Sequence, residues 1–247
     1  MNSEPPRPVL MERAEYVPAY RHEEFIVPLL RVAILDALDR YCRPDGRSKK
    51  VLDVGCGRQP FRIHLESMRY HYTAIDTQQF AENEKHFLGA IDGQLPLGLA
   101  AEGPFDLLLC TEVLEHVANW EGAFSNFAQL LAPGGRILIT CPHVYPLHEV
   151  PYDFWRPTTY SLEYFARRVN FTTVVKQQLG DGWDVIGTVL GIAKPHSLRG
   201  GIIGALLREF VSKVRWMFWL ILKSRFFQKS VSLGPMYISN LVVFERQ

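Results

Sequence analysis

The sequence predicts an α/β fold in which helices cover both faces of a mostly parallel sheet. Two observations support this class. Short apolar runs with the length of buried strands recur along the chain, and segments long enough for helices separate them. The chain has 247 residues, of which 47% are hydrophobic and 21% are charged, so it is large enough for one domain with a full hydrophobic core.

Each element has its own local signal. Apolar residues at helical spacing predict a helix over residues 23–41, and the turn Pro44-Asp45-Gly46 ends it. The other elements predicted from their patterns are strands over 51–54, 72–75, 105–109 and 136–140, and helices over 58–69 and 119–131. Thr158 or Thr159 can cap a helix that extends to residue 169, and strands over 171–177 and 238–245 complete the core.

The chain divides into four parts. Residues 1–47 are expected to form an N-terminal helical cap, residues 48–183 the core, and residues 235–247 the final core strand. Residues 184–234 form an insertion that is first rich in Gly and then basic and aromatic. Its most apolar run, residues 216–222, is far shorter than the roughly 18 residues that a membrane span requires.

Charge and cysteine usage limit the partners and the compartment. The formal net charge of +1 gives no general attraction to nucleic acid, so no nucleic-acid partner is expected. The four cysteines are scattered, and three of them end apolar runs, which is typical of buried free thiols. Because the N-terminus also lacks the pattern of a signal peptide, a cytoplasmic location is expected.

Residues 51–60, VLDVGCGRQP, place two glycines directly after the first predicted strand. Pro60 stands where a dinucleotide-binding GxGxxG motif needs its third glycine, and no Gly-Lys-Ser/Thr follows as in a P-loop. Asp53, beside the turn, would repel phosphate and suits a cationic group. The turn therefore predicts close backbone approach to a ligand with a cationic end.

Two further acids follow predicted strands. Asp76 ends YTAID, about 20 residues after the glycine turn, which is the spacing at which a carboxylate hydrogen-bonds ribose hydroxyls. Asp92 follows a third apolar segment and could accept from an exocyclic amine. Each acid alone could equally be a helix cap. Together with the glycine turn they form a series along the carboxyl edge of a parallel sheet, where open α/β sheets bind ligands.

With these residues in place, the sequence resembles the class I S-adenosylmethionine-dependent methyltransferases. The matching segments appear in the family's order and are VLDVGCG (51–57), AID (74–76), IDG (91–93), FDLLLCTEVLEHV (105–117) and LLAPGGRILITCP (130–142). The resemblance implies a Rossmann-like sheet of seven strands with the last strand antiparallel, one bound S-adenosylmethionine, and a helical insertion between the last two strands.

The resemblance also implies which residues contact the donor. They are Asp53, Gly55, Cys56, Gly57, Asp76, Thr77, Asp92, Gly93, Cys110 and Thr111. Asp76 would take the ribose hydroxyls, Asp92 the adenine amine, and Asp53 the ammonium side of the methionine moiety. Cys110 and Thr111 would lie under the transferred methyl group. Gln59 departs from the third glycine that many members have at this position.

A second motif, HEVPYDFWRPTTYSL (148–162), follows the fifth predicted strand. It resembles a bacterial subgroup that is often encoded with polysaccharide or cell-surface glycan genes. In one interpretation the motif is an acceptor-binding lid with His148 as general base, and His116 and Asp153 are further candidate catalytic residues. In the other it is a surface loop in which Asp153 pairs with Arg156.

The run EVLEHV offers a metal as an alternative to a base. If this segment is helical, Glu112, Glu115 and His116 share one face, and with His148 they would form an oxygen and nitrogen ligand set for Mg²⁺ or Mn²⁺. Glu115 and His116 would otherwise shape the pocket without a metal. Activity in the presence of a chelator separates these alternatives.

The basic and aromatic part of the insertion, residues 208–229, has two interpretations. Its composition is that of an interfacial helix that contacts anionic lipid, which would place the protein at a membrane surface. Alternatively, it caps the pocket or forms a homodimer interface, with its cations in solvent.

The sequence thus predicts an enzyme that moves the methyl group of S-adenosylmethionine to an oxygen of a sugar or lipid-linked glycan intermediate. An O- or C-methyltransferase of a quinone, polyketide or other small aromatic metabolite is the alternative, because the aromatic residues at 152–155 would suit a flat acceptor. The alternative outside enzymes is a catalytically silent protein that keeps the cofactor-binding fold.

Overall fold

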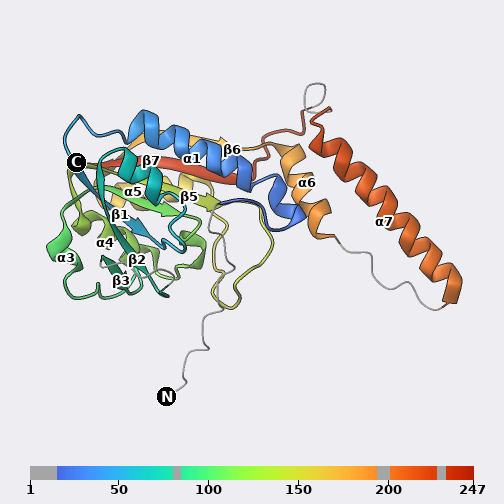
Figure 1. The fold of residues 1–247 in the computed structure, drawn as a ribbon, viewed down its shortest axis with the longest axis horizontal. Helices are drawn as coiled ribbons and strands as arrows, with labels where there is room; N and C mark the ends of the chain where they lie inside the picture. The colour runs from blue at the N-terminus through green and yellow to red at the C-terminus, as the bar shows by residue number, and fades with distance from the viewer. Residues whose placement is uncertain (1–15, 80–84, 194–200, 227–231) are drawn as a thin grey trace, which may run out of the picture.

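The computed structural model describes residues 16–79, 85–193, 201–226 and 232–247, and these form one seven-stranded sheet with helices around it (Figure 1). The strands are β1 (Lys49–Val54), β2 (Tyr70–Asp76), β3 (His86–Leu88), β4 (Phe105–Thr111), β5 (Leu131–Pro142), β6 (Phe171–Leu179) and β7 (Ser239–Arg246). Their order is β3-β2-β1-β4-β5-β7-β6, and β7 runs antiparallel to both of its neighbours. The predicted fold class, including the antiparallel last strand, is confirmed.

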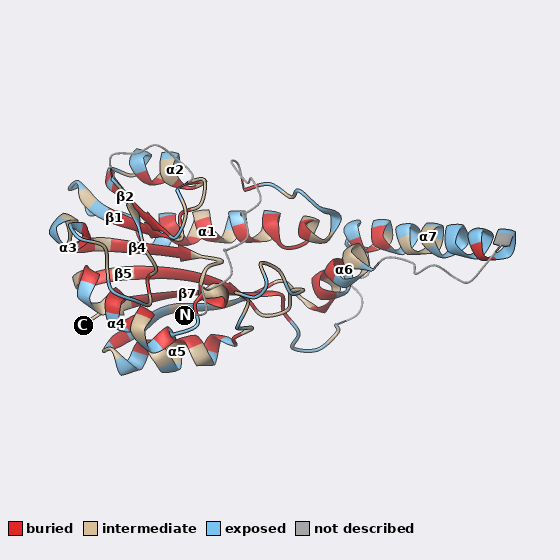
Figure 2. Ribbon diagram, turned by 90° about the horizontal axis from the view of Figure 1, so that it is seen from below, coloured by how far each residue is buried: buried red, intermediate tan, exposed pale blue. Residues whose placement is uncertain are grey.

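The helices cover both faces of the sheet (Figure 2). They are α1 (Val27–Tyr41), α2 (Arg62–Ser67), α3 (Leu99–Glu102), α4 (Trp120–Leu130), α5 (Thr159–Arg168), α6 (Gly182–Ile192) and α7 (Gly201–Lys223), with 3₁₀ turns η1 (Arg21–Glu24) and η2 (Leu114–His116). Helices α1 and α2 lie on one face, and α4 and α5 lie on the other.

The strands are apolar on both sides because each face has its own core. On β4, Leu107 and Leu109 pack with residues of α1 and α2, whereas Leu108 and Cys110 pack with residues of α4 and α5. Successive side chains of a strand point to opposite faces, so the continuous run predicted from the sequence supplies both cores. The order of the strands reverses at β1, between β2 and β4, and ligands of open α/β sheets bind at the carboxyl ends of such strands.

Two predicted helices have different bounds in the structure. The helix predicted over 23–41 begins at Val27, because Pro28 occupies the first turn, where a missing N–H costs nothing, and residues 21–24 form the separate turn η1. The helix predicted over 58–69 narrows to 62–67, because Gln59 and Arg69 have φ of 60° and 70°, which is left-handed backbone and cannot continue a helix.

The insertion between β6 and β7 contains α6 and α7. Asp181 caps α6 by accepting from the backbone N–H groups of Trp183 and Asp184, so the predicted boundary at residue 184 falls inside this helix. Helix α7 extends away from the sheet beside α6 (Figure 1). Among the described helices, none is long and apolar enough to cross a bilayer. Residues 1–15 of the predicted cap and residues 194–200 and 227–231 of the predicted insertion lie outside the described residues.

Candidate active site

Two adjoining pockets lie at the carboxyl ends of β1, β2 and β4. We name them the donor pocket, which Asp76 and Asp92 line, and the base pocket, which Asp53 and His148 line. The residues common to both are Gly55, Glu112, His116 and Glu149. The site therefore lies at the sheet edge that the sequence predicts, and His116 stands where the two pockets meet.

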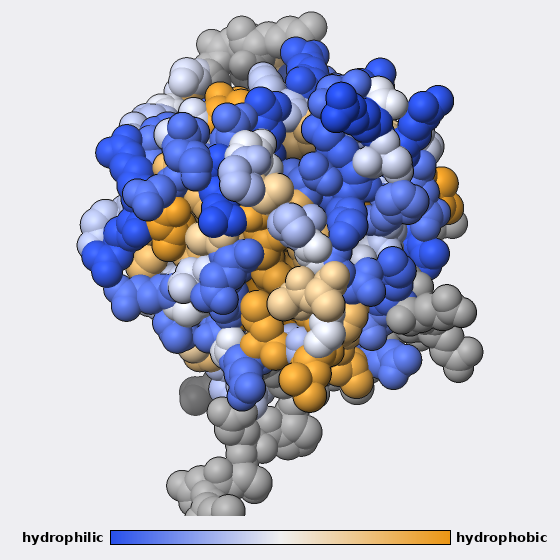
Figure 3. Space-filling view, turned by 90° about the vertical axis from the view of Figure 1, so that its left-hand side faces the viewer, coloured by the Kyte–Doolittle hydropathy of each residue, from blue (hydrophilic) through white to orange (hydrophobic). Residues whose placement is uncertain are grey.

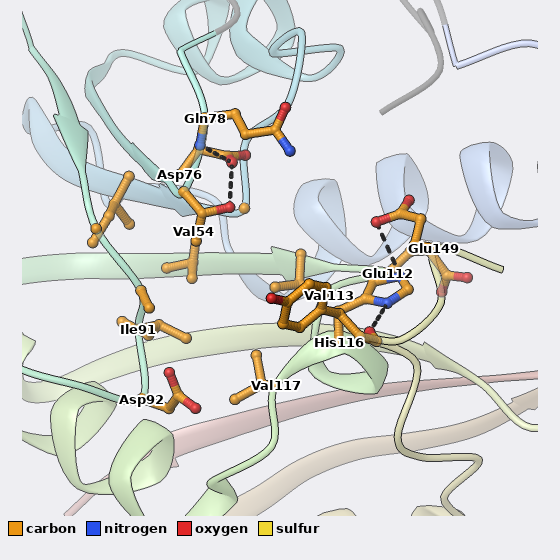
Figure 4. A pocket seen from close by; sticks show the side chains of 16 residues that line it. Val54, Asp76, Gln78, Ile91, Asp92, Glu112, Val113, His116, Val117 and Glu149 are labelled. Atoms are coloured by element: carbon orange, nitrogen blue, oxygen red, sulfur yellow. Dashed lines mark hydrogen bonds and ion pairs between the residues drawn. The ribbon is translucent and has the colours of Figure 1, made fainter. Parts of the chain in front are cut away.

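The donor pocket is an apolar slot with a carboxylate on either side (Figure 4). Asp76, at the end of β2, is 5% exposed and accepts hydrogen bonds from the backbone N–H groups of Gly57 at 2.9 Å and Gln78 at 3.0 Å. Asp92 accepts from the backbone N–H of Asn119 at 3.2 Å. The apolar side chains that line the slot are Val54, Ile75, Ile91, Val113 and Val117. This arrangement suits a flat heterocycle attached to a ring with hydroxyl groups.

The glycine turn lets the backbone pass close to η2. Gly55 has φ of 64°, and a Cβ atom at this position would lie 2.3 Å from Cγ2 of Val113. Both the left-handed backbone and the contact require glycine here. Gly57 also has a positive φ, of 49°, and its N–H is the group that Asp76 holds. This hydrogen bond therefore connects the glycine turn after β1 to the end of β2.

Asp53 is a buried carboxylate on the wall of the base pocket. It is 3% exposed, and its Oδ2 accepts a hydrogen bond from the hydroxyl of Tyr72 at 2.5 Å. Burial raises the pKa of Asp53 to about 7, although the bond from Tyr72 opposes this rise, and the nearby Asp76 raises the pKa further. Its hydrogen-bond partner is neutral, so a cationic ligand group beside Asp53 would stabilise the ionised form.

His116 presents a basic nitrogen at the junction of the pockets. Its Nδ1 lies 2.7 Å from the backbone carbonyl of Tyr152, and because a carbonyl only accepts, Nδ1 carries the proton. In the neutral ring Nε2 then keeps its lone pair, and it lies 3.8 Å from a carboxylate oxygen of Glu149. Burial lowers the pKa of His116 to about 4. The ring is therefore a neutral hydrogen-bond acceptor throughout the physiological range.

The segment around His148 is fixed by an internal ion pair. The side chain of Asp153 is fully buried and binds Arg156 through both of its oxygens, at 2.6 and 2.7 Å. Asp153 also accepts from the backbone N–H of His148 at 2.9 Å. Burial would raise the pKa of Asp153, but the hydrogen bonds from Arg156 and His148 hold it below its usual value.

The structure contains the pair between Asp153 and Arg156 that the second sequence interpretation predicts. Arg156 donates to the carbonyls of Tyr145 and Pro146, so the Asp153–Arg156 pair anchors the loop. His148 lines the base pocket, and its ring lies edge-on to that of His116 with centroids 4.7 Å apart. Asp153 lines neither pocket, so its contacts are those of a positioning residue for His148.

All four predicted metal ligands line the base pocket, but Glu112 lies outside the tight group that the other three form. Glu112 has φ of 55° and precedes the η2 turn, so it does not share a helical face with Glu115 and His116. Within the described part of the chain, Glu115, His116 and His148 place one ligand atom each within 4.8 Å of the others. Burial raises the pKa of Glu115 well above its usual value. By themselves, one carboxyl and two imidazoles are a poor match to the oxygen-rich shell that Mg²⁺ or Mn²⁺ prefers, and further carboxylates of this pocket belong to Glu112 and Glu149.

The remaining predicted donor residues are divided between the pockets and the core. Thr77 lines the donor pocket, and Cys56 and Thr111 line the base pocket. Cys110 is fully buried in the core beneath them. Gly93 lines neither pocket, and its carbonyl accepts from the side chain of Asn126, which also bonds the carbonyl of Ile91. Asn126 thus fixes the turn that carries Asp92.

Sequence reasoning missed the wall that the N-terminal segment contributes. Ile26, Val27 and Leu30 line the base pocket together with Tyr16 and Tyr145. Their apolar spacing looks the same as that of an ordinary core helix, so the sequence has no signal for this role. Glu149 was also missed, although it follows His148 directly. The wall gives the base pocket an apolar side.

Comparisons with known proteins agree with this geometry. A family model described as a methyltransferase domain matches residues 20–173. The ubiquinone biosynthesis O-methyltransferase of Xylella fastidiosa (strain 9a5c) is 35% identical over 100 residues, which is 37% of this chain and 41% of that protein. The enzyme of the same name from Aromatoleum aromaticum is 31% identical over 121 residues, 43% of this chain and 48% of that protein. The chain spans less than half the length of these curated relatives.

Solved structures share the fold at low sequence identity. A SAM-dependent methyltransferase from Archaeoglobus fulgidus superposes with a TM-score of 0.52 at 14% identity, covering 87% of this chain and 94% of that one. Coclaurine N-methyltransferase bound to N-methylheliamine and SAH gives a TM-score of 0.53 at 18% identity, covering 87% and 72%. Because the family model spans more than half of the chain and the sheet order agrees, the chain belongs to the methyltransferase domain family, with the class I fold of the S-adenosylmethionine-dependent enzymes.

Proposed function

We propose that the protein transfers the methyl group of S-adenosylmethionine to an oxygen of a small aromatic acceptor, such as a phenolic hydroxyl of a quinone-type metabolite. The observation that carries this proposal is the neutral His116, whose Nε2 stands at the junction of the donor and base pockets. The names of the curated relatives support the aromatic acceptor over the glycan acceptor that the sequence favoured first.

The donor pocket and the adjoining Asp53 wall of the base pocket together fit S-adenosylmethionine. Asp76 would hold the ribose hydroxyls, Asp92 the adenine amine, and Asp53 the ammonium group. When bound, this cofactor supplies an electrophilic methyl group on a sulfonium. The chain then has to align an acceptor oxygen with that methyl group and to exclude water.

His116 would accept the proton of the acceptor hydroxyl at Nε2. The carboxylate of Glu149, 3.8 Å from this nitrogen, would offset the positive charge that develops on the ring. The carbonyl of Tyr152 holds the ring in the required tautomer through Nδ1. His148 lies at the side of His116 and would contact the acceptor in the base pocket.

His116→Ala is expected to reduce kcat by about 10²- to 10⁴-fold, because the acceptor hydroxyl loses its base. The affinity for S-adenosylmethionine should stay unchanged, since the carboxylates of the donor pocket remain. Steady-state kinetics with a catechol and calorimetry with S-adenosylmethionine measure the two effects separately. His71→Ala is the matched control, because His71 is an exposed histidine that lines neither pocket. If His148→Ala abolishes turnover and His116→Ala does not, the base is His148.

Treatment with a chelator is expected to leave the rate of methyl transfer unchanged, because proton transfer to Nε2 of His116 requires no metal. Methyl transfer is measured after dialysis against EDTA and again after Mg²⁺ or Mn²⁺ is added. A rate that falls in chelator and returns with either metal would contradict this expectation and would assign the Glu115, His116 and His148 group to metal binding.

The acceptor class is tested with labelled S-adenosylmethionine and a panel of catechols, hydroxyquinones, free sugars and lipid-linked sugars. Labelling of catechols or hydroxyquinones supports the proposal, and labelling of sugars alone would return the assignment to a glycan acceptor. Calorimetry without an acceptor provides the first control, since a protein that does not bind S-adenosylmethionine cannot carry the proposed reaction.

A further inference from the structure

Helix α7 has an apolar face that is largely exposed, with one edge beside the end of α6, where Phe210 and Phe218 line a groove with Leu190. Ile203, Phe210 and Met217 are seven residues apart and so share one face, and they are 74%, 65% and 50% exposed. Leu206 and Leu207 lie on the same side and are also exposed. A surface helix normally has the opposite arrangement, with its apolar stripe against the core. Figure 2 shows most of α7 as exposed, beyond the end of α6.

The other face of α7 holds this orientation. Trp219 and Leu222 are buried in a small cluster with Phe25, whose ring meets that of Trp219 edge-on at 5.9 Å. Arg215 donates to the carbonyls of Leu190 and Ala193 at the end of α6.

Two further cations of this end pair with the body. Lys223 pairs with Glu24 of η1, and Arg225 lies 3.5 Å from a carboxylate oxygen of Asp184 in α6. Turning the apolar face inward would break all of these contacts. The exposed face is therefore a fixed feature of the fold rather than a core face left without its partner.

The apolar face is wider than the seam that one partner helix would cover. In a two-stranded coiled coil the positions beside the seam are usually charged. Here Val211 and Phe218 flank one side of the Ile203-Phe210-Met217 line. The other flank consists of Leu206, Lys213 and Leu220, so it carries a single charge between two apolar residues. All five flanking residues are exposed. A face that covers about half of the helix circumference suits a flat apolar medium, as in helices that lie at a membrane surface.

Positive charge is concentrated in residues 194–229, which we call the α7 arm, and negative charge in the rest of the chain, which we call the body. Residues 194–229 contain eight Lys and Arg residues and one acid, Glu209, which gives this segment a formal charge of +7. Because the whole chain is +1, the remaining residues together carry −6. An anionic lipid surface would attract the α7 arm and repel the body. Both effects favour an orientation in which α7 faces the lipid.

We propose that α7 is an interfacial helix that holds the protein on an anionic lipid surface. Its apolar face would lie among the upper acyl chains, and Arg208 and Lys213, both exposed, would lie at the level of the lipid phosphates. Phe25, which contacts Trp219 of α7, directly precedes Ile26 and Val27 on the wall of the base pocket. One segment thus connects the membrane contact to the acceptor side of the site. The inference does not depend on the identity of the acceptor.

Co-sedimentation of the full chain with lipid vesicles tests this proposal. Vesicles of phosphatidylcholine mixed with phosphatidylglycerol are expected to retain the protein, and added salt should weaken the binding. The double substitution Phe210→Ser with Met217→Ser should reduce the partition constant by about tenfold or more, since two apolar side chains leave the lipid. Ile63→Ser with Leu97→Ser is the matched control, because both residues are exposed and apolar but lie outside α7.

A second pair of variants tests the charge. Arg208→Gln with Lys213→Gln should reduce binding to the phosphatidylglycerol vesicles by about 30-fold and should have little effect on binding to phosphatidylcholine alone. Unchanged affinity for S-adenosylmethionine in every variant shows that the body is folded and separates this test from that of the proposed function.

Two results would overturn the proposal. One is equal sedimentation of the wild type and the Phe210→Ser, Met217→Ser variant. The other is a wild type that ignores vesicles but sediments as a dimer in the ultracentrifuge, with the same double substitution producing monomers. In that case a second copy of the chain covers α7.

Discussion

Asp76→Ala is expected to weaken the binding of S-adenosylmethionine by about 10²- to 10⁴-fold. In the proposed binding mode the substitution removes two hydrogen bonds from the ribose to a charged acceptor, each of which would contribute about 1.5–3 kcal/mol. It also frees the N–H groups of Gly57 and Gln78, so the glycine turn loses its connection to the end of β2. Titration calorimetry measures the affinity directly.

Two further variants show whether the effect of Asp76→Ala is specific to the carboxylate. Asp36→Ala is the matched control, because Asp36 is an acid of α1 that pairs with Arg40 and lines neither pocket. Asp76→Asn keeps one oxygen acceptor and should give an intermediate affinity. A folded Asp76→Ala protein that binds S-adenosylmethionine as the wild type does would remove the donor pocket from the proposal.

At alkaline pH, Asp53→Asn is expected to stabilise the folded protein and at the same time to weaken the binding of S-adenosylmethionine. Because the folded-state pKa of Asp53 is raised from 3.8 to about 7, the folded protein binds more protons than the unfolded chain between these values. The free energy of unfolding therefore decreases as the pH rises through this window, and the cost of the buried charge is fully present above pH 7. Asn carries no charge and can still accept from Tyr72, so the variant should gain about 2–4 kcal/mol of stability at alkaline pH.

The same substitution should weaken the binding of S-adenosylmethionine above pH 7 by about tenfold or more, because an ammonium group loses its carboxylate. Below pH 6 the two proteins should bind alike, since Asp53 is then largely protonated in the free wild type. Denaturant unfolding and calorimetry across this range measure both effects. Equal affinities at alkaline pH would show that Asp53 does not face the cationic end of the ligand.

These two predictions concern residues that the sequence alone could place. Strands buried on both faces are continuous apolar runs, and in a parallel sheet their carboxyl ends meet at one edge. Asp53 lies near the end of such a run, and Asp76 and Asp92 end or follow one, so their approximate relation to each other was predictable without coordinates. Features that depend only on the local backbone were also predictable. Gly55 is an example, because its turn requires a positive φ.

The acceptor side could not be predicted in the same way, because it depends on contacts between distant segments. EVLEHV is compatible with a helix, but left-handed backbone at Glu112 separates this residue from Glu115 and His116. Asp153 resembles a catalytic acid until its pairing with Arg156 is seen. The proton position on His116 is set by the carbonyl of Tyr152, which is 36 residues away in the chain.

The sequence by itself determined the fold class, the family resemblance and the donor-binding edge, since periodicity and strand-end residues are local properties. Only the tertiary structure decided which histidine stands between the pockets, that the N-terminal segment forms a wall of the base pocket, and that α7 directs its apolar face outward. An amphipathic helix has the same pattern whether its apolar side meets a core, a second chain or a lipid surface. The side of α7 that faces the protein is set by its buried residues, Trp219 and Leu222, and by the ion pairs at its end.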